Sequence, residues 1–377
     1  MITKRLLDVC DFQGGTQPPK EEWINDPRDG YVRMLQIRDY SQGDAKFIQY
    51  VKDTKKLHKC KKDDIMLSRY GYIGQAFMGL EGAYNVALVK VIKKEEIHTP
   101  YLLYYFQSYY FQHFLLSNVG ARATIPGFNK DELENALIRI PEMKEQVEIA
   151  SKIAKVDELI DFHKQQLDIL ETLIKSRFIE MFGECEEHKR LEEYANLITK
   201  GASPKWQGVD YCEEGTLFVT SENVREGYLD LSKRKYLDNK INEIQPRSML
   251  KRNDILINIV GASIGRTTVY DCDEVANINQ AVALVRVDYS QINQTYLTTF
   301  LNSPQAIEMY GKMKKGGARD NLSLQNIADL QIPVASIDLQ NQFAAFVEQT
   351  DKSKFEIQKS LEKLEILKKS LMQQYFG

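Results

Sequence analysis

Most of the residue patterns that carry out catalysis are absent from this sequence. It has no Walker-type glycine loop, no dinucleotide-binding G-x-G-x-x-G and no G-x-S-x-G nucleophile motif. Its five histidines are not spaced as metal ligands. The only double proline, Pro18-Pro19, lacks the preceding Asn or Asp and the following aromatic residue of an amino-methyltransferase loop. The sequence therefore argues against an enzyme and predicts no metal site.

Two arrangements of carboxylates could be catalytic, and both have a simpler interpretation. Glu142-Met143-Lys144 has part of the spacing of a restriction-type nuclease, but it opens a long helical pattern and no Pro-Asp pair precedes it. Asp64 and Asp254 each stand directly before a short apolar run, where an acid is typical of a turn. We interpret both arrangements as structural, so we expect no catalytic residue.

What recurs instead is a set of small, polar loops that appear in the same order in the two halves of the chain. Arg can fork onto guanine, Asn and Gln can pair with adenine, and Ser or Thr can bind a phosphate or a base. Glycine lets a backbone approach a partner closely. The first-half candidates for DNA contact are Thr16, Gln36, Arg38, Arg69, Tyr70, Gln75, Arg122, Thr124, Asn129 and Lys130. The second-half candidates are Ser203, Lys205, Ser221, Asn223, Asn258, Ser263, Arg266, Asn279, Gln280, Arg319, Asn321, Ser323 and Gln325.

The elements that must position these loops are duplicated. Residues 146–183 align without a gap on residues 340–377, and both segments end in Phe-Gly. Upstream the match continues with short insertions or deletions; for example, residues 64–68 align on residues 254–258. Such a repeat predicts the same order of elements in both halves.

The two aligned segments predict long amphipathic helices. Each carries a heptad stripe, and about 37 residues at roughly 1.5 Å per residue exceed the width of a small domain. Polar positions in one stripe match apolar positions in the other, as Lys368 matches Ile174, so we expect the helices to pair with each other within one chain. The stripes are Ile149, Ile153, Val156, Ile160, His163, Leu167, Leu170, Ile174, Arg177 and Met181, and Phe343, Val347, Thr350, Lys354, Ile357, Leu361, Leu364, Lys368, Leu371 and Tyr375.

The rest of each half predicts a mixed α/β (α+β) fold with short strands. Predicted strands are 65–68, 87–92, 255–259 and 281–287, and predicted helices are 101–116 and 294–309. The predicted organisation is a domain at 1–145, a helix at 146–183, a domain at 184–339 and a helix at 340–377.

Bulk composition fits this plan. A chain of 377 residues, 27% charged and 43% hydrophobic, predicts about two globular domains. It has no apolar run long enough to cross a membrane, and its five cysteines are scattered, so we expect a cytoplasmic protein that contacts no membrane. A net charge of −3 argues mildly against binding DNA, although lysines cluster locally between residues 52 and 62.

The sequence resembles the specificity subunit of type I restriction–modification systems. The similar stretches are Gly201-x-Ser203-Pro204, Asp254-Ile-Leu-Ile-Asn-Ile-Val-Gly-Ala-Ser-Ile-Gly265, Asn277-Ile-Asn-Gln280, and Ile332-Pro333 followed by Gln340. The long helices closing on Phe-Gly are also typical of this family. The first half departs from the pattern, with Ser68-Arg69-Tyr70-Gly71 in place of the Gly-Ala-Ser loop and Ala83-Tyr84-Asn85 in place of Asn-Gln.

The resemblance implies two target-recognition domains, each reading one part of a split site in double-stranded DNA. It implies that the two long helices pair antiparallel, set the spacing between half-sites and dock two modification (methyltransferase) subunits, which restriction (motor–nuclease) subunits join. The chain itself would be non-catalytic and without a cofactor. S-adenosylmethionine, Mg and ATP would bind only to the partner subunits.

A second hypothesis is a non-catalytic coiled-coil scaffold that does not bind DNA. The net acidity favours it slightly. It predicts no DNA binding even at low salt, where contacts to phosphates are strongest.

Overall fold

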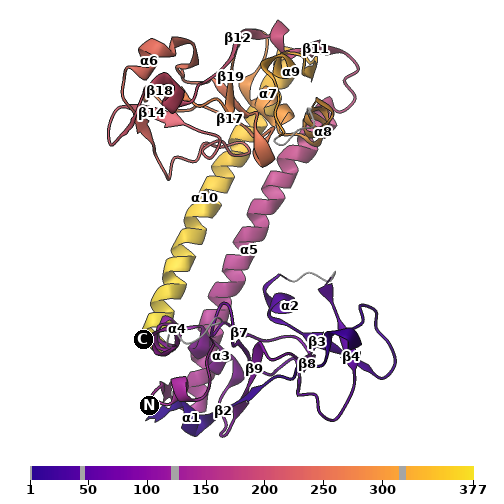
Figure 1. The fold of residues 1–377 in the computed structure, drawn as a ribbon, viewed down its shortest axis with the longest axis vertical. Helices are drawn as coiled ribbons and strands as arrows, with labels where there is room; N and C mark the ends of the chain where they lie inside the picture. The colour runs from indigo at the N-terminus through magenta and orange to yellow at the C-terminus, as the bar shows by residue number, and fades with distance from the viewer. Residues whose placement is uncertain (1, 43–46, 120–126, 314–319) are drawn as a thin grey trace. The chain divides into compact units, whose positions relative to one another are not determined.

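The computed structural model describes residues 2–42, 47–119, 127–313 and 320–377. The chain forms two compact units. Unit 1 combines residues 1–164 with residues 359–377, and unit 2 comprises residues 165–358. Each unit contains two four-stranded sheets, several short helices and parts of two long helices (Figure 1).

In unit 1 the larger body is built on a sheet with strand order β2-β9-β6-β7, and a smaller sheet has the order β4-β3-β8-β5. The strands are β1 (Ile2–Arg5), β2 (Cys10–Gly14), β3 (Tyr31–Leu35), β4 (Tyr50–Lys52), β5 (Lys59–Cys60), β6 (Met66–Ser68), β7 (Ala76–Phe77), β8 (Gly82–Tyr84), β9 (Leu88–Lys93) and β10 (Leu137–Ile140), the first and last of which pair with each other. The short helices are α1 (Leu6–Val9), η1 (Lys20–Glu22), α2 (Ile37–Ser41), α3 (Thr99–Gln107), α4 (Tyr109–Asn118) and η3 (Asp131–Leu133).

Unit 2 repeats this plan with sheets ordered β12-β19-β16-β17 and β13-β15-β14-β18. The strands are β11 (His188–Arg190), β12 (Ala195–Lys200), β13 (Tyr211–Cys212), β14 (Thr216–Val219), β15 (Tyr236–Leu237), β16 (Ile255–Asn258), β17 (Thr267–Val269), β18 (Ala276–Ile278), β19 (Val282–Val287) and β20 (Gln331–Pro333), with β11 paired to β20. The short helices are η4 (Leu191–Glu193), η5 (Pro204–Gln207), α6 (Ile241–Ile244), η6 (Pro246–Ser248), η7 (Gly261–Ser263), α7 (Gln294–Leu301), α8 (Pro304–Met313) and α9 (Leu324–Ala328).

The pairing of strands confirms the predicted internal repeat. In the larger sheet of each unit all neighbouring strands are antiparallel, and the order of strands is equivalent. Each smaller sheet contains one parallel pair, β3 with β8 in unit 1 and β14 with β18 in unit 2. The predicted mixed fold class is therefore correct.

The two long helices, α5 (Met143–Phe182) and α10 (Ile337–Phe376), lie side by side within each unit. In unit 1 the Lys368 Nζ lies 2.6 Å from the Asp157 carboxylate, and the His163 Nε2 lies 3.0 Å from the Ser360 hydroxyl. Numbers fall along one helix as they rise along the other, so the pairing is antiparallel. His163 and Lys368, polar positions in the predicted stripes, thus have polar partners on the opposite helix.

The cores of both units are completed by the long helices. In unit 1 the Phe376 ring packs 5.1 Å from the Tyr101 ring, and Ile153 of α5 is fully buried nearby. In unit 2 the Phe182 ring lies 4.6 Å from the Tyr296 ring in the same cluster as Phe343. Each core therefore uses the start of one long helix and the end of the other.

The segments predicted to be helical, 101–116 and 294–309, are each divided into two helices, a break that the sequence did not predict. Ser108 ends α3, and its hydroxyl oxygen accepts a hydrogen bond from the Phe111 backbone N–H, which caps α4. In unit 2 Pro304 lacks an N–H donor and begins α8 as its first residue. None of the helices in the described part of the chain is long and apolar enough to cross a membrane.

Replacing Phe178 with alanine tests the dependence of unit 2 on α5. The Phe178 side chain is 7% exposed and contacts Tyr296, Phe300 and Phe343. Because the truncation leaves a cavity, it should lower the free energy of unfolding by about 3–5 kcal/mol. Phe355→Ala, at a position 66% exposed on α10 in the same unit, should cost less than about 0.5 kcal/mol in urea unfolding followed by circular dichroism. Equal losses for the two variants would contradict this account.

Candidate nucleic-acid interface

In unit 2 the predicted polar loops meet through close backbone contacts. Gly201 packs on the loop that follows β18, since a Cβ added to Gly201 would lie 1.7 Å from the Ile278 carbonyl oxygen. The Asn279 N–H donates to the Val219 carbonyl at 3.1 Å, which joins that loop to the end of β14. Segments far apart in sequence thus form one continuous edge of the unit.

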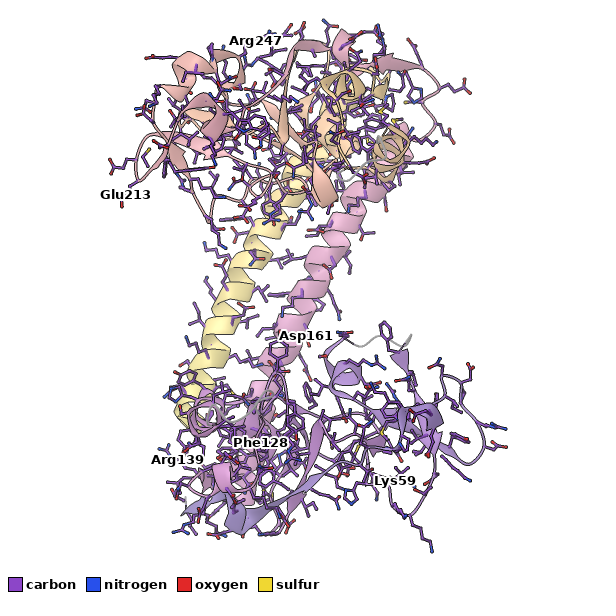
Figure 2. The ribbon with its side chains drawn as sticks, in the orientation of Figure 1. Lys59, Phe128, Arg139, Asp161, Glu213 and Arg247 are labelled. Carbon is purple, nitrogen blue, oxygen red and sulfur yellow. The ribbon has the colours of Figure 1, made fainter. Side chains whose placement is uncertain are left out.

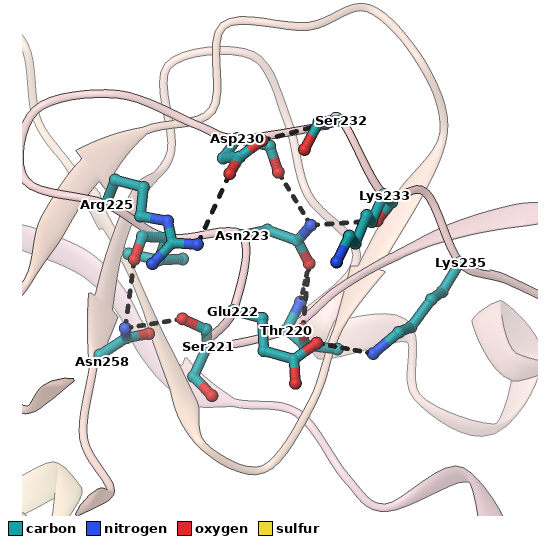
Figure 3. Close-up of polar contacts among 11 residues, drawn as sticks. Thr220, Ser221, Glu222, Asn223, Arg225, Asp230, Ser232, Lys233, Lys235 and Asn258 are labelled. Carbon is teal, nitrogen blue, oxygen red and sulfur yellow. Dashed lines mark hydrogen bonds and ion pairs between the residues drawn. The ribbon is translucent and has the colours of Figure 1, made fainter. Parts of the chain in front are cut away.

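Two buried asparagines hold the loop between β14 and β15 (Figure 3). The Asn223 Oδ1 accepts bonds from the backbone N–H and the hydroxyl of Thr220 at 2.9 and 3.0 Å, and its Nδ2 donates to the Asp230 carbonyl at 2.9 Å. The Asn258 Nδ2 donates to the Ser221 carbonyl at 3.0 Å. The Asn258 Nδ2 also donates to the Val224 carbonyl at 3.3 Å and to the Ser263 hydroxyl at 3.2 Å. Both amides thus donate inside the unit, and their side chains shape the loop rather than project from it.

Unit 1 contains equivalent backbone contacts between its loops. A Cβ on Gly15 would lie 2.0 Å from the Asn85 carbonyl oxygen, and the Asn85 N–H donates to the Leu35 carbonyl at 3.1 Å. The Asn85 Oδ1 accepts from the Ala87 N–H at 3.1 Å, which is the distance of the equivalent bond made by Asn279 in unit 2. Asn85 therefore takes the place of Asn279, although the first-half sequence departs from the pattern there.

Left-handed glycines shape the loop after the central strand in both units. Gly71 and Gly261 have φ of 73° and 78°, and Gly74 and Gly265 have φ of 80° and 90°. Other residues rarely adopt this conformation. At Gly265 a Cβ would also lie 2.5 Å from the Tyr310 ring. These glycines thus fix the backbone of the loop. Ile73 and Ile264 pack against the cores of their units, while Tyr72 and Ala262 are exposed.

Several predicted side chains of unit 1 are held in place by neighbours. The Arg69 guanidinium lies over the Tyr70 ring, donates to the Phe128 carbonyl at 3.0 Å and bonds to Asn129. Phe128 is buried in the larger body of unit 1. Lys59, on β5, marks the smaller sheet of the same unit (Figure 2). Fixing a guanidinium in this way lowers the entropy lost when it binds a partner.

A second held group in unit 1 lies on α2 and the residues before it. The Arg38 guanidinium donates to the Gln49 side-chain oxygen at 2.8 Å, and the Gln36 amide donates to the same oxygen at 3.2 Å.

Lys130 forms an ion pair with Asp11, and hydrogen bonding to that ammonium holds the Asp11 pKa below its usual range. Lys130 is therefore partly neutralised within the chain.

The other predicted residues differ in their surroundings. Ser323 caps α9 by accepting from the Asn326 N–H at 3.1 Å, and Gln325 bonds to Asp329 at 3.1 Å. Exposed side chains are Gln75, Lys205, Arg266, Gln280 and Asn321, and half-buried ones are Thr16, Ser203, Ser221 and Ser263. Arg122, Thr124 and Arg319 lie outside the described residues.

The acids Asp64 and Asp254 stand at equivalent turns, as interpreted from the sequence. Asp254 is buried, accepts from the Lys251 N–H at 2.7 Å and binds Arg286 through two bonds of 2.7 and 2.6 Å, which raise the Arg286 pKa. Asp64 accepts from the backbone and lies 3.4 Å from Lys90. Both acids are engaged in holding the turn and the strand beside it.

Groups suited to catalysis are not apparent in the described part of the chain. No group of three His, Cys, Asp or Glu residues there could hold a metal ion. Burial raises the pKa of the Cys10 thiol to about 12 and also raises that of Cys60. A nucleophilic thiol needs the opposite shift.

Two exposed aromatic residues were missed by the analysis of the sequence. Trp206, on η5, is 84% exposed, and Tyr72, between Gly71 and Gly74, is 78% exposed. Both lie in loops already selected for their polar residues. The sequence feature that could have indicated Trp206 is an aromatic residue directly after a basic one, Lys205, in a segment that contains glycine and proline.

The family comparison decides the class of the protein. The profile described as "Type I restriction modification DNA specificity domain" matches residues 1–172 and 187–368, nearly the whole chain. The chain belongs to this family. Similar curated proteins are the type I restriction enzyme MjaVIII specificity subunit of Methanocaldococcus jannaschii, 23% identical over 98% of this chain and 90% of that protein, and the EcoBI specificity subunit of Escherichia coli, 24% identical over 88% and 75%.

Solved structures support the specificity-subunit fold. One comes from a study titled as the assembly and conformational transition of the type I R-M system, with a TM-score of 0.63, 15% identity, and coverage of 100% of this chain and 97% of that chain. Another is the S subunit from M. genitalium, with a TM-score of 0.58, 16% identity, and coverage of 100% and 96%. Specificity subunits recognise DNA and are the non-catalytic component of these systems.

Asp254→Asn and Asp64→Asn test the unequal burial of the two turns. Removing the charge at Asp254 leaves a partly buried Arg286 without its carboxylate, so unit 2 should lose about 2–3 kcal/mol. Asp64→Asn should cost less than about 1 kcal/mol because its ion pair is longer and more exposed. Hydrogen exchange of β16 and β6 amides measures each effect separately. A larger loss of protection at β6 would show that burial does not set the difference.

Proposed function

We propose that this chain reads a bipartite site in double-stranded DNA for a type I restriction–modification complex. Residues 1–145 and 184–339 would each read one half of the site. The observation that carries the proposal is the duplicated edge of polar loops, joined through Gly15 and Asn85 in unit 1 and through Gly201 and Asn279 in unit 2.

The loops suit the reading of base edges because their backbones are fixed and their exposed side chains differ. Unit 1 presents Gln75 beside the half-buried Arg69, whose guanidinium bonds to Phe128 and Asn129, and unit 2 presents Arg266 and Gln280. Guanidinium and amide groups can pair with guanine and adenine, respectively. The exposed side chains also include Tyr72 in unit 1 and Lys205, Trp206 and Asn321 in unit 2. Because these two sets differ, the two half-sites should differ in sequence.

The long helices at 146–183 and 340–377 would set the distance between the half-sites. They would also dock two modification (methyltransferase) subunits, which restriction (motor–nuclease) subunits join. Linking two weak recognition events in a fixed geometry raises affinity through effective concentration. S-adenosylmethionine, Mg and ATP would bind to those partners, consistent with the absence of cofactor motifs in this sequence.

A scaffold that does not bind DNA is less well supported. Its support is the net charge of −3 and the internal pairing of several cations, such as Arg252 with Asp271 and Lys235 with Glu222. A scaffold would not need two equivalent sets of glycine-locked polar loops. Binding to duplex DNA at low salt distinguishes the two hypotheses.

Exchanging one recognition domain tests whether each domain reads one half of the DNA site. Residues 1–145 are replaced by the first domain of another specificity subunit, and methylated adenines are located by sequencing DNA treated with the complex containing the modification subunits. One half of the methylated motif should change, and the other half should stay as in the parent. The reciprocal exchange of residues 184–339 is the matched control. A change in both halves after either exchange would contradict the proposal.

A further inference from the structure

Trp206 is more exposed than any other large hydrophobic side chain in the described part of the chain, at 84%. An indole ring has a large apolar surface, and proteins usually bury it against a partner or their own core. Trp23, the only other tryptophan of the sequence, is half-buried and donates its indole N–H to the Pro18 carbonyl at 3.2 Å. The Trp206 indole N–H has no such partner among the described residues.

The turn that carries Trp206 is well held, so its exposure does not reflect a loose segment. The Trp206 N–H donates to the Ser203 carbonyl at 3.1 Å, and the Val209 N–H donates to the Pro204 carbonyl at 3.1 Å. Pro204 and Val209 are both buried, and Gly208 closes the turn with a φ of 67°. A ring presented on a fixed turn loses little entropy when it binds a partner.

The surroundings of Trp206 favour a polyanion as that partner. Lys205 directly precedes Trp206 and Lys200 stands six residues before it; both are exposed, and neither has a carboxylate partner within the described residues. The nearest acids on the other side, from Asp210 onward, lie beyond the buried Val209. Gly201, at the start of the same loop, packs against Ile278, two residues before Gln280. Trp206 therefore belongs to a loop that packs on the candidate edge of polar loops, and this loop carries two cations, unpaired in the part of the chain that the structure describes, before the ring in sequence.

We propose that Trp206 contacts the bases of the half-site read by unit 2, with Lys200 and Lys205 on the neighbouring phosphates. This inference rests on the proposed function. Aromatic side chains pack against bases or enter base steps in many DNA complexes, and they contribute affinity without requiring a hydrogen bond. The contact belongs to unit 2, because the corresponding turn of unit 1, η1, begins at Lys20 and tucks Trp23 inward.

Fluorescence isolates this residue because the sequence has two tryptophans. In a Trp23→Phe variant assembled with the modification subunits, the emission of Trp206 is obtained by subtracting the emission of the same complex carrying both Trp23→Phe and Trp206→Phe, which removes the contribution of the partner subunits. Adding a duplex that contains the methylated motif should quench this emission and protect it from iodide. The matched Trp206→Phe variant, which reports Trp23, should show little change.

Affinity provides the second measurement. Trp206→Ala should weaken binding to the specific duplex by roughly tenfold, and Trp206→Phe should retain most of the affinity. Unchanged emission together with unchanged affinity would overturn the inference while leaving the proposed function intact. A change in emission on adding modification subunits without DNA would also overturn it, since the ring would then face a protein. If the unsubstituted chain shows no preference for any duplex, the proposed function itself fails.

Discussion

The packing of long-helix ends into each core is the interaction on which the rest of the molecule depends. Phe376, at the end of the chain, completes the core of unit 1 beside Tyr101, and Phe178 and Phe182, from the middle of the chain, complete the core of unit 2 beside Tyr296. Unit 1 is therefore built from two separate stretches of sequence, residues 1–164 and 359–377, whereas unit 2 is the continuous stretch of residues 165–358. The helices α5 and α10 each contribute side chains to both cores. The two cores therefore depend on the same pair of helices.

This arrangement separates the scaffold from the residues that differ between the units. Backbone bonds and glycines fix the loops at equivalent positions, as Asn85 and Asn279 illustrate with the same turn. Exposed positions on equivalent loops carry unlike side chains, such as Tyr72 after Gly71 in unit 1 and Ala262 after Gly261 in unit 2. A domain built in this way can change which bases it contacts at little cost in stability, since surface substitutions away from caps and cores have small effects.

The sequence was sufficient for the features that follow from periodicity and duplication. The heptad stripes gave both long helices, although these begin at Met143 and Ile337, slightly before the aligned segments. The breaks at Ser108 and Pro304 were missed because the apolar pattern continues across them, while a cap and a missing donor interrupt the backbone. For the candidate site, residue type did not reveal burial. Asn223 and Asn258 look like base readers in sequence, but both side chains are buried and their amide N–H groups donate to neighbours inside the unit.

The most direct test of the central claim is the motif methylated by a complex of this chain with its modification subunits, determined by sequencing modified adenines across a genome. Two edges of polar loops on one chain predict two specified segments separated by a gap of constant length and unspecified sequence. A single uninterrupted motif, or methylation without sequence preference, would contradict the account.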